Sequence, residues 1–163
     1  MAETSPIRPT DDEARALARR LLDGARFGAL GVRDPETGAP VVTRIAVATT
    51  PDGAPLTLIS DLSQHTRALR ADPACSLLVG EPGPKGDPLT HPRLTIQAHA
   101  AFIDRRGPGQ AALRAHYLAQ QPKAKLYIDF GDFSLVRLMP TGAYLNGGFG
   151  KAFVLTPEDL AKG

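Results

Sequence analysis

The amino-acid sequence predicts a mainly β protein, in which an antiparallel sheet curls into a β-barrel with flanking helices. Two observations predict this class. From Phe27 onward, apolar and polar residues alternate in short runs, which is the period of a β-strand. Turn-forming segments such as "DPETGAP" and "PDG" separate these runs at close spacing, and few helical stretches lie between them.

Length, charge and cysteine content indicate what kind of β protein this is. A chain of 163 residues suits one domain that buries its own core. The net charge of +2 is too small to favour nucleic acid or a membrane as a partner. A single cysteine, Cys75, excludes a disulfide framework and favours a reducing compartment, so we expect a cytoplasmic protein. Residues 1–9 are expected to form a flexible N-terminal arm, and residues 10–163 a single domain.

Three helices are expected beside the sheet. The first covers residues 10–24, where Thr10 and Glu13 have the spacing of a capping box and apolar residues recur at helical intervals. The other two each stop before a proline. They cover residues 63–72 and 109–121.

The expected strands are the alternating runs between these helices. They cover residues 26–34, 41–50, 54–60, 75–81, 93–103, 132–140, 143–148 and 151–156. The run at 93–103 alternates most regularly, and its polar face carries Arg93, Thr95, Gln97 and His99. That face is either solvated or part of a binding site.

Common catalytic and metal-binding motifs are absent. The segment "NGGFGKA" at 146–152 lacks the spacing of a phosphate-binding loop, so we expect a bend between strands. The four histidines lie in four segments without metal-ligand spacing. There is no nucleophile elbow, and Cys75 opens an apolar strand as a small buried residue would. The sequence therefore predicts no metal site and assigns no catalytic residue.

One helix start carries unusual charges. The first turn of a helix favours acids, yet the segment "SDLSQHTR" at 60–67 places His65, Thr66 and Arg67 there. Free N–H groups beside a hydroxyl and a cation form a phosphate site. An ordinary capped surface helix is the alternative.

Arg44 offers another cation. The strand at 41–50 places it on one face with Ala46 and Ala48, which leaves a shallow bay with a cation at its edge. The alternative is an arginine on a solvated face. Combined with the segment at 60–67, this arrangement favours a small anionic ligand over a polymer.

The order of these segments resembles the pyridoxamine 5′-phosphate oxidase-related, FMN-binding split-barrel family. The resemblance runs from about Ala14 to Leu155, and its most specific segments are "LTLISDLSQHTRALRADPACSLLV" and "GDFSLVRLMPTGAYLNGGFGKA". Within the family these segments look closest to the branch that contains haem-utilisation proteins. The resemblance implies a six-stranded antiparallel split barrel that forms a homodimer, with ligand sites at the dimer interface.

The resemblance also implies which residues bind FMN. Arg44 matches an arginine that contacts the FMN phosphate, and the segment at 60–67 matches the strand end and helix start that supply further phosphate ligands. The implied cofactor-binding residues are Arg44, Thr49, Ser60, His65, Thr66, Arg67, Arg93 and Gln97. The chain departs from the oxidase where His65 and Thr66 replace an Arg-Lys pair and Thr49 replaces a lysine. The oxidase's C-terminal substrate-binding cluster of Arg and His also has no counterpart, so pyridoxamine phosphate oxidation is not expected.

Two functions remain open. In the first, the chain is an FMN-binding flavoprotein, and the flavin carries the redox chemistry of an oxidoreductase. In the second, it is a haem-binding protein of haem utilisation, or a non-catalytic binding protein, that keeps the same fold without flavin. The absorption spectrum of the purified protein distinguishes the two.

Overall fold

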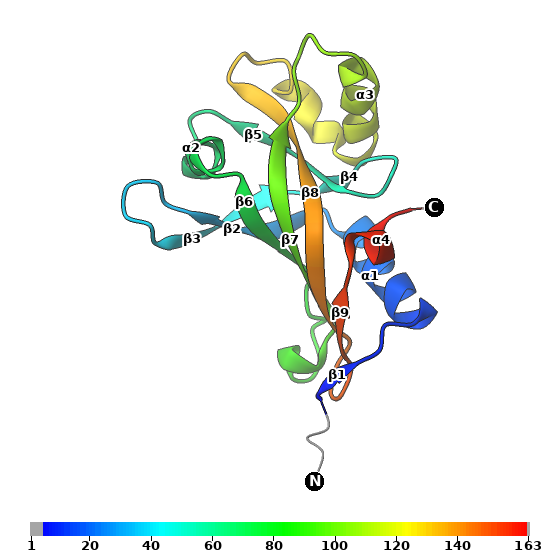
Figure 1. Cartoon of the computed structure of the whole chain (residues 1–163). Coiled ribbons are helices and arrows are strands. Elements are labelled where there is room, and N and C mark those ends of the chain that lie inside the picture. Colours follow the sequence, from blue (N-terminus) through cyan, green and yellow to red (C-terminus); the bar gives the residue numbers. More distant parts are fainter. Residues whose placement is uncertain (1–4, 163) are drawn as a thin grey trace.

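The computed structural model describes residues 5–162 as one nine-stranded sheet with helices around it (Figure 1). The strands are β1 (Ile7–Arg8), β2 (Phe27–Arg33), β3 (Pro40–Ala46), β4 (Ala48–Thr49), β5 (Pro55–Ser60), β6 (Ala74–Val79), β7 (Arg93–Phe102), β8 (Phe133–Asn146) and β9 (Ala152–Leu155). The α-helices are α1 (Asp12–Gly24), α2 (Gln64–Ala71), α3 (Gln110–Gln120) and α4 (Pro157–Leu160). Two 3-10 helices cover Pro88–Thr90 and Pro122–Leu126. No helix of the described residues is both long enough and apolar enough to cross a membrane.

The predicted fold class is confirmed. The strand order is β1-β9-β8-β7-β6-β2-β3, with β5 on β8 and β4 on β5, and every pair except β1 with β9 is antiparallel. Six strands of six residues or more, β2, β3, β5, β6, β7 and β8, form the curled part of the sheet. The two- to four-residue strands β1, β4 and β9 extend it.

The sheet is open where a closed barrel would join β3 to β5. No strand pairing links these two strands among residues 5–162. Only Val47 separates β3 from β4, so one bent stretch pairs first with β2 and then with β5. The hydroxyl of Thr57 donates to the carbonyl of Ala46 at 2.7 Å across this opening.

β8 joins two strands that the sequence separates. It runs through Pro140 and Gly142, and its register with β7 shifts between Gln97 and Ala98, which leaves Thr141 as an extra residue. A proline in a strand is tolerated at such a bulge, because no ladder hydrogen bond is required of it there.

Two separate cores hold the elements together. The larger core lies inside the curled sheet, where inward residues of seven strands, β2, β3 and β5 to β9, meet α1, α2 and α4. The smaller core lies between β5, β8 and the segment of α3 and the following 3-10 helix, with Tyr117 fully buried in it. In Figure 1 this segment caps one end of β7 and β8, and β1 lies at the other end.

The N-terminal segment differs from the expectation at two points. Of the expected arm, residues 1–4 lie outside the described residues, and Ile7 and Arg8 pair with β9. The predicted capping box is wrong, because Asp11 caps α1 by accepting the N–H of Ala14 at 2.8 Å. Thr10 donates instead to the carbonyl of Val154, a contact 144 residues away.

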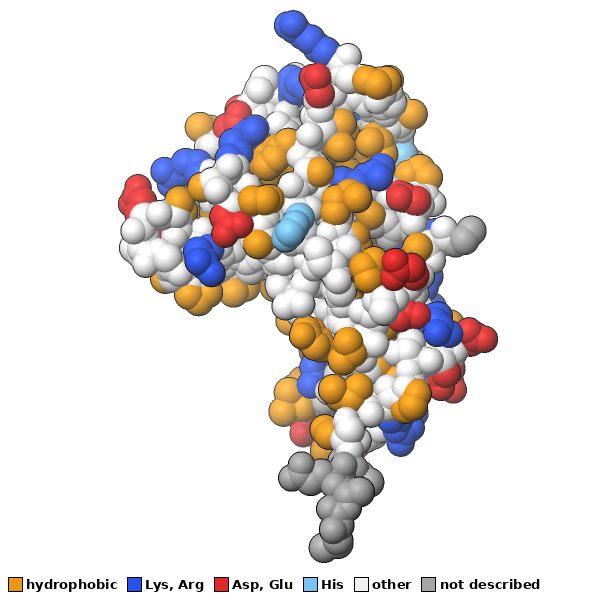
Figure 2. All heavy atoms as spheres, in the orientation of Figure 1, with side chains coloured by type: hydrophobic (Ala, Val, Ile, Leu, Met, Phe, Trp, Pro, Cys, Tyr) orange, Lys and Arg blue, Asp and Glu red, His pale blue; other side chains and the backbone are white. Residues whose placement is uncertain are grey.

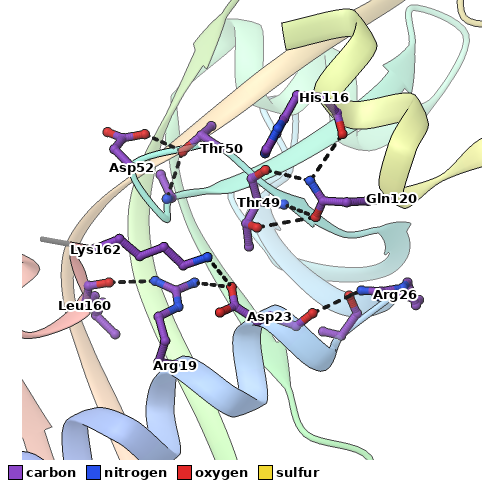
Figure 3. Close-up of polar contacts among 12 residues, drawn as sticks. Arg19, Asp23, Arg26, Thr49, Thr50, Asp52, His116, Gln120, Leu160 and Lys162 are labelled. Atoms are coloured by element: carbon purple, nitrogen blue, oxygen red, sulfur yellow. Dashed lines mark hydrogen bonds and ion pairs between the residues drawn. The ribbon is translucent and has the colours of Figure 1, made fainter.

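Polar contacts join α1, near the start of the chain, to the C-terminal turn (Figure 3). Arg19 of α1 donates to the carbonyl of Leu160 at 2.7 Å and lies 3.0 Å from the carboxylate of Asp23. Lys162 lies 3.3 Å from the same carboxylate, so the C-terminal turn is tied to α1.

Candidate functional site

A hydrogen bond links the first turn of α2 to β3. Nδ1 of His65 lies 3.0 Å from the hydroxyl of Thr43. Burial lowers the pKa of His65 below its usual value near 6.5, so its imidazole is neutral at pH 7. His65 therefore brings a hydrogen-bonding group to this helix start but no positive charge.

Ser60 already has partners at the end of β5. Its hydroxyl donates to a carboxylate oxygen of Asp132 at 2.6 Å and accepts the N–H of Leu62 at 3.1 Å. A phosphate placed against Ser60 would face this carboxylate, and like charges repel.

The side chains of Thr66 and Arg67 leave α2 in different directions, one buried and the other exposed. Thr66 is fully buried, and its hydroxyl has no hydrogen-bond partner among the described residues. Arg67 is exposed and lines a small hollow of about 70 Å³ together with Asp34 and Glu36. Arg67, the cation that was expected beside a phosphate, thus lies next to two acidic side chains.

The other expected residues lie elsewhere. Thr49 is buried, and both its backbone N–H and its hydroxyl donate to Gln120 of α3. Arg93 donates to backbone carbonyls of the loop before β7, at 2.9 Å to Leu89. Arg44 and Gln97 lie on the face of the sheet that points away from the larger core. The structure does not gather the eight expected residues into one pocket.

That outward face of β2, β3, β6, β7 and the part of β8 from Met139 onward, with β9 beside it, is here called the outer face. Figure 2 shows hydrophobic side chains spread over the part of it that faces the viewer. Its large exposed hydrophobic residues are Phe27, Val42, Leu78, Met139, Tyr144 and Val154. A gathering of this kind is typical of a surface that contacts another molecule.

Two neighbouring hollows shape the outer face. The larger hollow, of about 740 Å³, lies where β2, β3 and β6 meet the end of α1, and the guanidinium of Arg44 lies over Phe27 beside it at 5.4 Å. Its charged lining residues are Arg20, Arg26, Arg44 and Glu81. The smaller hollow, of about 670 Å³, lies over β2, β6 and β7. Its small lining residues include Gly31, Ala74, Ser76 and Ala98, and its charged or titratable ones are Arg33, Asp72, Cys75 and His99.

Sequence reasoning missed Arg33 and Asp132. The alternation in β2 places Ala29, Gly31 and Arg33 on one face, which could have indicated a small-residue floor ending in a cation. Nothing local to Ser60 indicates Asp132, because that carboxylate comes from 72 residues further along the chain.

Comparison with known proteins places the chain in a family. The family model for pyridoxamine 5′-phosphate oxidase matches residues 14–147, so the chain belongs to that family. It is 35% identical over 143 residues to the chloroplastic non-canonical heme oxygenase HOZ of Arabidopsis thaliana, an alignment that covers 86% of this chain and 42% of that protein.

Two solved structures support the assignment. A heme binding protein from Mycobacterium smegmatis is 31% identical with a TM-score of 0.82, over 94% of this chain and 61% of that one. A protein of unknown function from Agrobacterium tumefaciens is 35% identical with a TM-score of 0.80, over 98% and 66%. The chain thus spans between 42% and 66% of the length of these three relatives. The predicted family and its likeness to haem-related members are both confirmed.

Proposed function

We propose that this protein is a haem-binding protein of haem utilisation, which binds haem on the outer face of its sheet as a homodimer. The observation that carries the proposal is the smaller hollow, where a floor of small residues ends in a cation. Haem is a flat apolar ring with two carboxylates at one edge, and it needs a flat apolar surface with cations at the rim. The relatives named as a heme oxygenase and a heme binding protein support the same ligand class.

One row of paired residues forms the floor of the smaller hollow. Gly31, Ser76 and Gln97 pair side by side across β2, β6 and β7, and Gly142 continues the row on β8. Neighbouring strands lie roughly 4.8 Å apart, so the row spans roughly 14 Å. The glycines at both ends of the row carry no side chain, so a planar ring can approach the backbone there, and the side chains of Ser76 and Gln97 between them would face the ring.

Arginines on the outer face would hold the carboxylates. Arg33 lines the smaller hollow, and Arg26 and Arg44 line the larger one. Guanidinium groups bind carboxylates through charge-assisted hydrogen bonds, often two at a time. When bound, haem supplies a redox-active iron, and the chain would orient it and control its access to water.

A second copy of the chain would cover the exposed hydrophobic side chains of the outer face. Large apolar side chains such as Leu78 and Tyr144, 42% and 53% exposed, are stabilised when a partner removes them from water. Light scattering on the purified chain should then give the mass of a dimer, and Leu78→Arg should give a monomer. A monomeric wild-type chain would contradict the homodimer.

An FMN-dependent oxidoreductase is the second candidate. One observation favours it, because the buried and unpartnered hydroxyl of Thr66 lies in the first turn of α2, where a phosphate ligand is expected. The neutral His65 and the carboxylate beside Ser60 oppose it.

Equilibrium titration of the apo-protein with haemin, and separately with FMN, tests the proposal. We expect haemin to give a saturable change in the Soret band at one equivalent per chain, and FMN fluorescence to remain unquenched. Saturable FMN binding without haemin binding would reverse the choice between the two candidates.

A further inference from the structure

We infer that His99 ligates the haem iron and that Arg33 pairs with a haem carboxylate on the same surface. This inference rests on the proposed function. His99 lies on β7, is exposed, and lines the smaller hollow. Its ring nitrogens form no hydrogen bond within residues 5–162, so a lone pair is available to a metal. A neutral imidazole nitrogen is a common axial ligand of haem iron.

The other histidines are placed differently. His65 is half-buried and hydrogen-bonded to Thr43 on the other side of β3. Both ring nitrogens of His91 contact backbone atoms of the loop at 83–85, one accepting an N–H at 2.9 Å and the other lying 2.8 Å from a carbonyl oxygen. His116 belongs to α3, which packs over the smaller core and not on the outer face. Among the described residues, His99 is thus the only histidine that lines one of the two hollows of the outer face.

The two sulfur-containing side chains near the smaller hollow are less suited, and that of Cys75 is buried in the larger core. Burial raises the pKa of Cys75 to about 11, so its sulfur stays a protonated thiol, hydrogen-bonded toward the carbonyl of Ala98. Met139 is the direct partner of His99 across β7 and β8 and is 44% exposed. Its thioether points to the same face, which makes Met139 the alternative ligand and a natural control.

Arg33 is spaced for a carboxylate at the edge of the ring. It lines the same hollow as His99, from β2, and β6 separates the two strands. Two strand spacings place the two backbones roughly 10 Å apart. The nearby acid is Asp72, whose carboxylate accepts the N–H of Ala74 at 3.0 Å and is thereby held at the start of β6.

Two porphyrins separate ligation from surface binding. Haemin carries iron, and iron-free protoporphyrin has the same ring and carboxylates without it. We expect His99→Ala to weaken haemin binding by at least about tenfold, because changing even a residue that only supports a metal ligand costs about 10–100-fold in metal affinity. Binding of protoporphyrin to this variant should stay within about twofold of wild type, whereas Arg33→Ala should weaken both porphyrins.

Spectroscopy tests direct ligation. The ferric spectrum of haemin in His99→Ala should lose the histidine-ligated form, and free imidazole should restore it. Met139→Leu, a volume-conserving change on the same face, should keep the wild-type spectrum. Circular dichroism melting curves of the variants confirm that each is folded.

Three outcomes overturn the inference. A His99→Ala variant with wild-type haemin affinity and spectrum would show that another residue ligates the iron. Loss of the ligated spectrum in Met139→Leu alone would assign the iron to the thioether. A wild-type chain that binds neither porphyrin would overturn the proposed function, and this inference with it.

Discussion

The hydroxyl of Ser60 donates a hydrogen bond to Oδ2 of Asp132 at 2.6 Å, and the backbone carbonyl of Asp132 accepts the N–H of Asp61 at 2.7 Å. The end of β5 is therefore fastened to the chain just before β8. The same contact places a carboxylate where the family resemblance implies a phosphate. The contact between Ser60 and Asp132 therefore affects both the stability of the domain and the charge of the ligand that can bind beside Ser60.

Asp132→Ala should destabilise the fold. Hydrogen bonds to charged groups contribute about 1.5–3 kcal/mol, so we expect the free energy of unfolding in urea to fall by that amount. Asp129→Ala is the matched control, because Asp129 pairs with Arg114 on the exposed surface and should matter less. A larger loss in the control than in Asp132→Ala would contradict this account of the β5 end.

Gly28→Ala should destabilise the sheet, whereas Gly24→Ala should not. A Cβ at Gly28 would lie 2.8 Å from the carbonyl oxygen of Leu78 and 2.9 Å from a methyl group of Leu77, so a cost of about 1–3 kcal/mol is expected from overpacking. A Cβ at Gly24, the last residue of α1, meets nothing within 4 Å. Thermal melting of the two variants measures the contrast, and equal melting temperatures would refute it.

Gln120→Ala should weaken the attachment of α3. The Gln120 side chain accepts the backbone N–H of Thr49 at 2.9 Å and donates to the Thr49 carbonyl at 2.9 Å, in the way a neighbouring strand would (Figure 3). Leaving both backbone groups without a partner costs about 1–3 kcal/mol. Gln110→Ala, in the same helix, provides the control, and chemical denaturation should show a clear loss only for Gln120→Ala.

His65 should make stability fall on mild acidification. Burial lowers its pKa in the folded state, so the unfolded chain takes up the proton first as the pH falls through about 6.5. The free energy of unfolding should therefore decrease from pH 7 toward pH 5, and His65→Gln should show a smaller decrease. Nuclear magnetic resonance titration of His65 should give a midpoint below 6.5, and a midpoint above it would reverse the sign.

Local patterns predicted most of the fold. The alternation of β7 placed Arg93, Thr95, Gln97 and His99 on one face, and the helix at 109–121 was found at Gln110–Gln120. The predicted cap of α1 was wrong because the Thr10 hydroxyl donates a hydrogen bond to the carbonyl of Val154, far along the chain. β8 was divided in two because its bulge makes Pro140 acceptable, which the local sequence does not reveal.

The site was harder to predict than the fold. The segment at 60–67 has the composition of a phosphate site, but three long-range contacts decide what it can bind. The carboxylate of Asp132 accepts the hydrogen bond of the Ser60 hydroxyl, and the hydroxyl of Thr43 is hydrogen-bonded to the half-buried His65. Two acidic side chains line the same small hollow as Arg67. Arg33 and His99 lie far apart in the chain, and only the strand order β2-β6-β7 brings them to one hollow.

The measurement that tests the central claim most directly is paramagnetic broadening of backbone amide resonances when haemin is added to the apo-protein. Ferric iron broadens the signals of nearby nuclei, so it marks where the ring lies. The account predicts loss of signal at Gly31, Ser76 and Gln97 on the outer face, with the signals of α2 retained. Broadening confined to the first turn of α2, or no broadening at all, would contradict it.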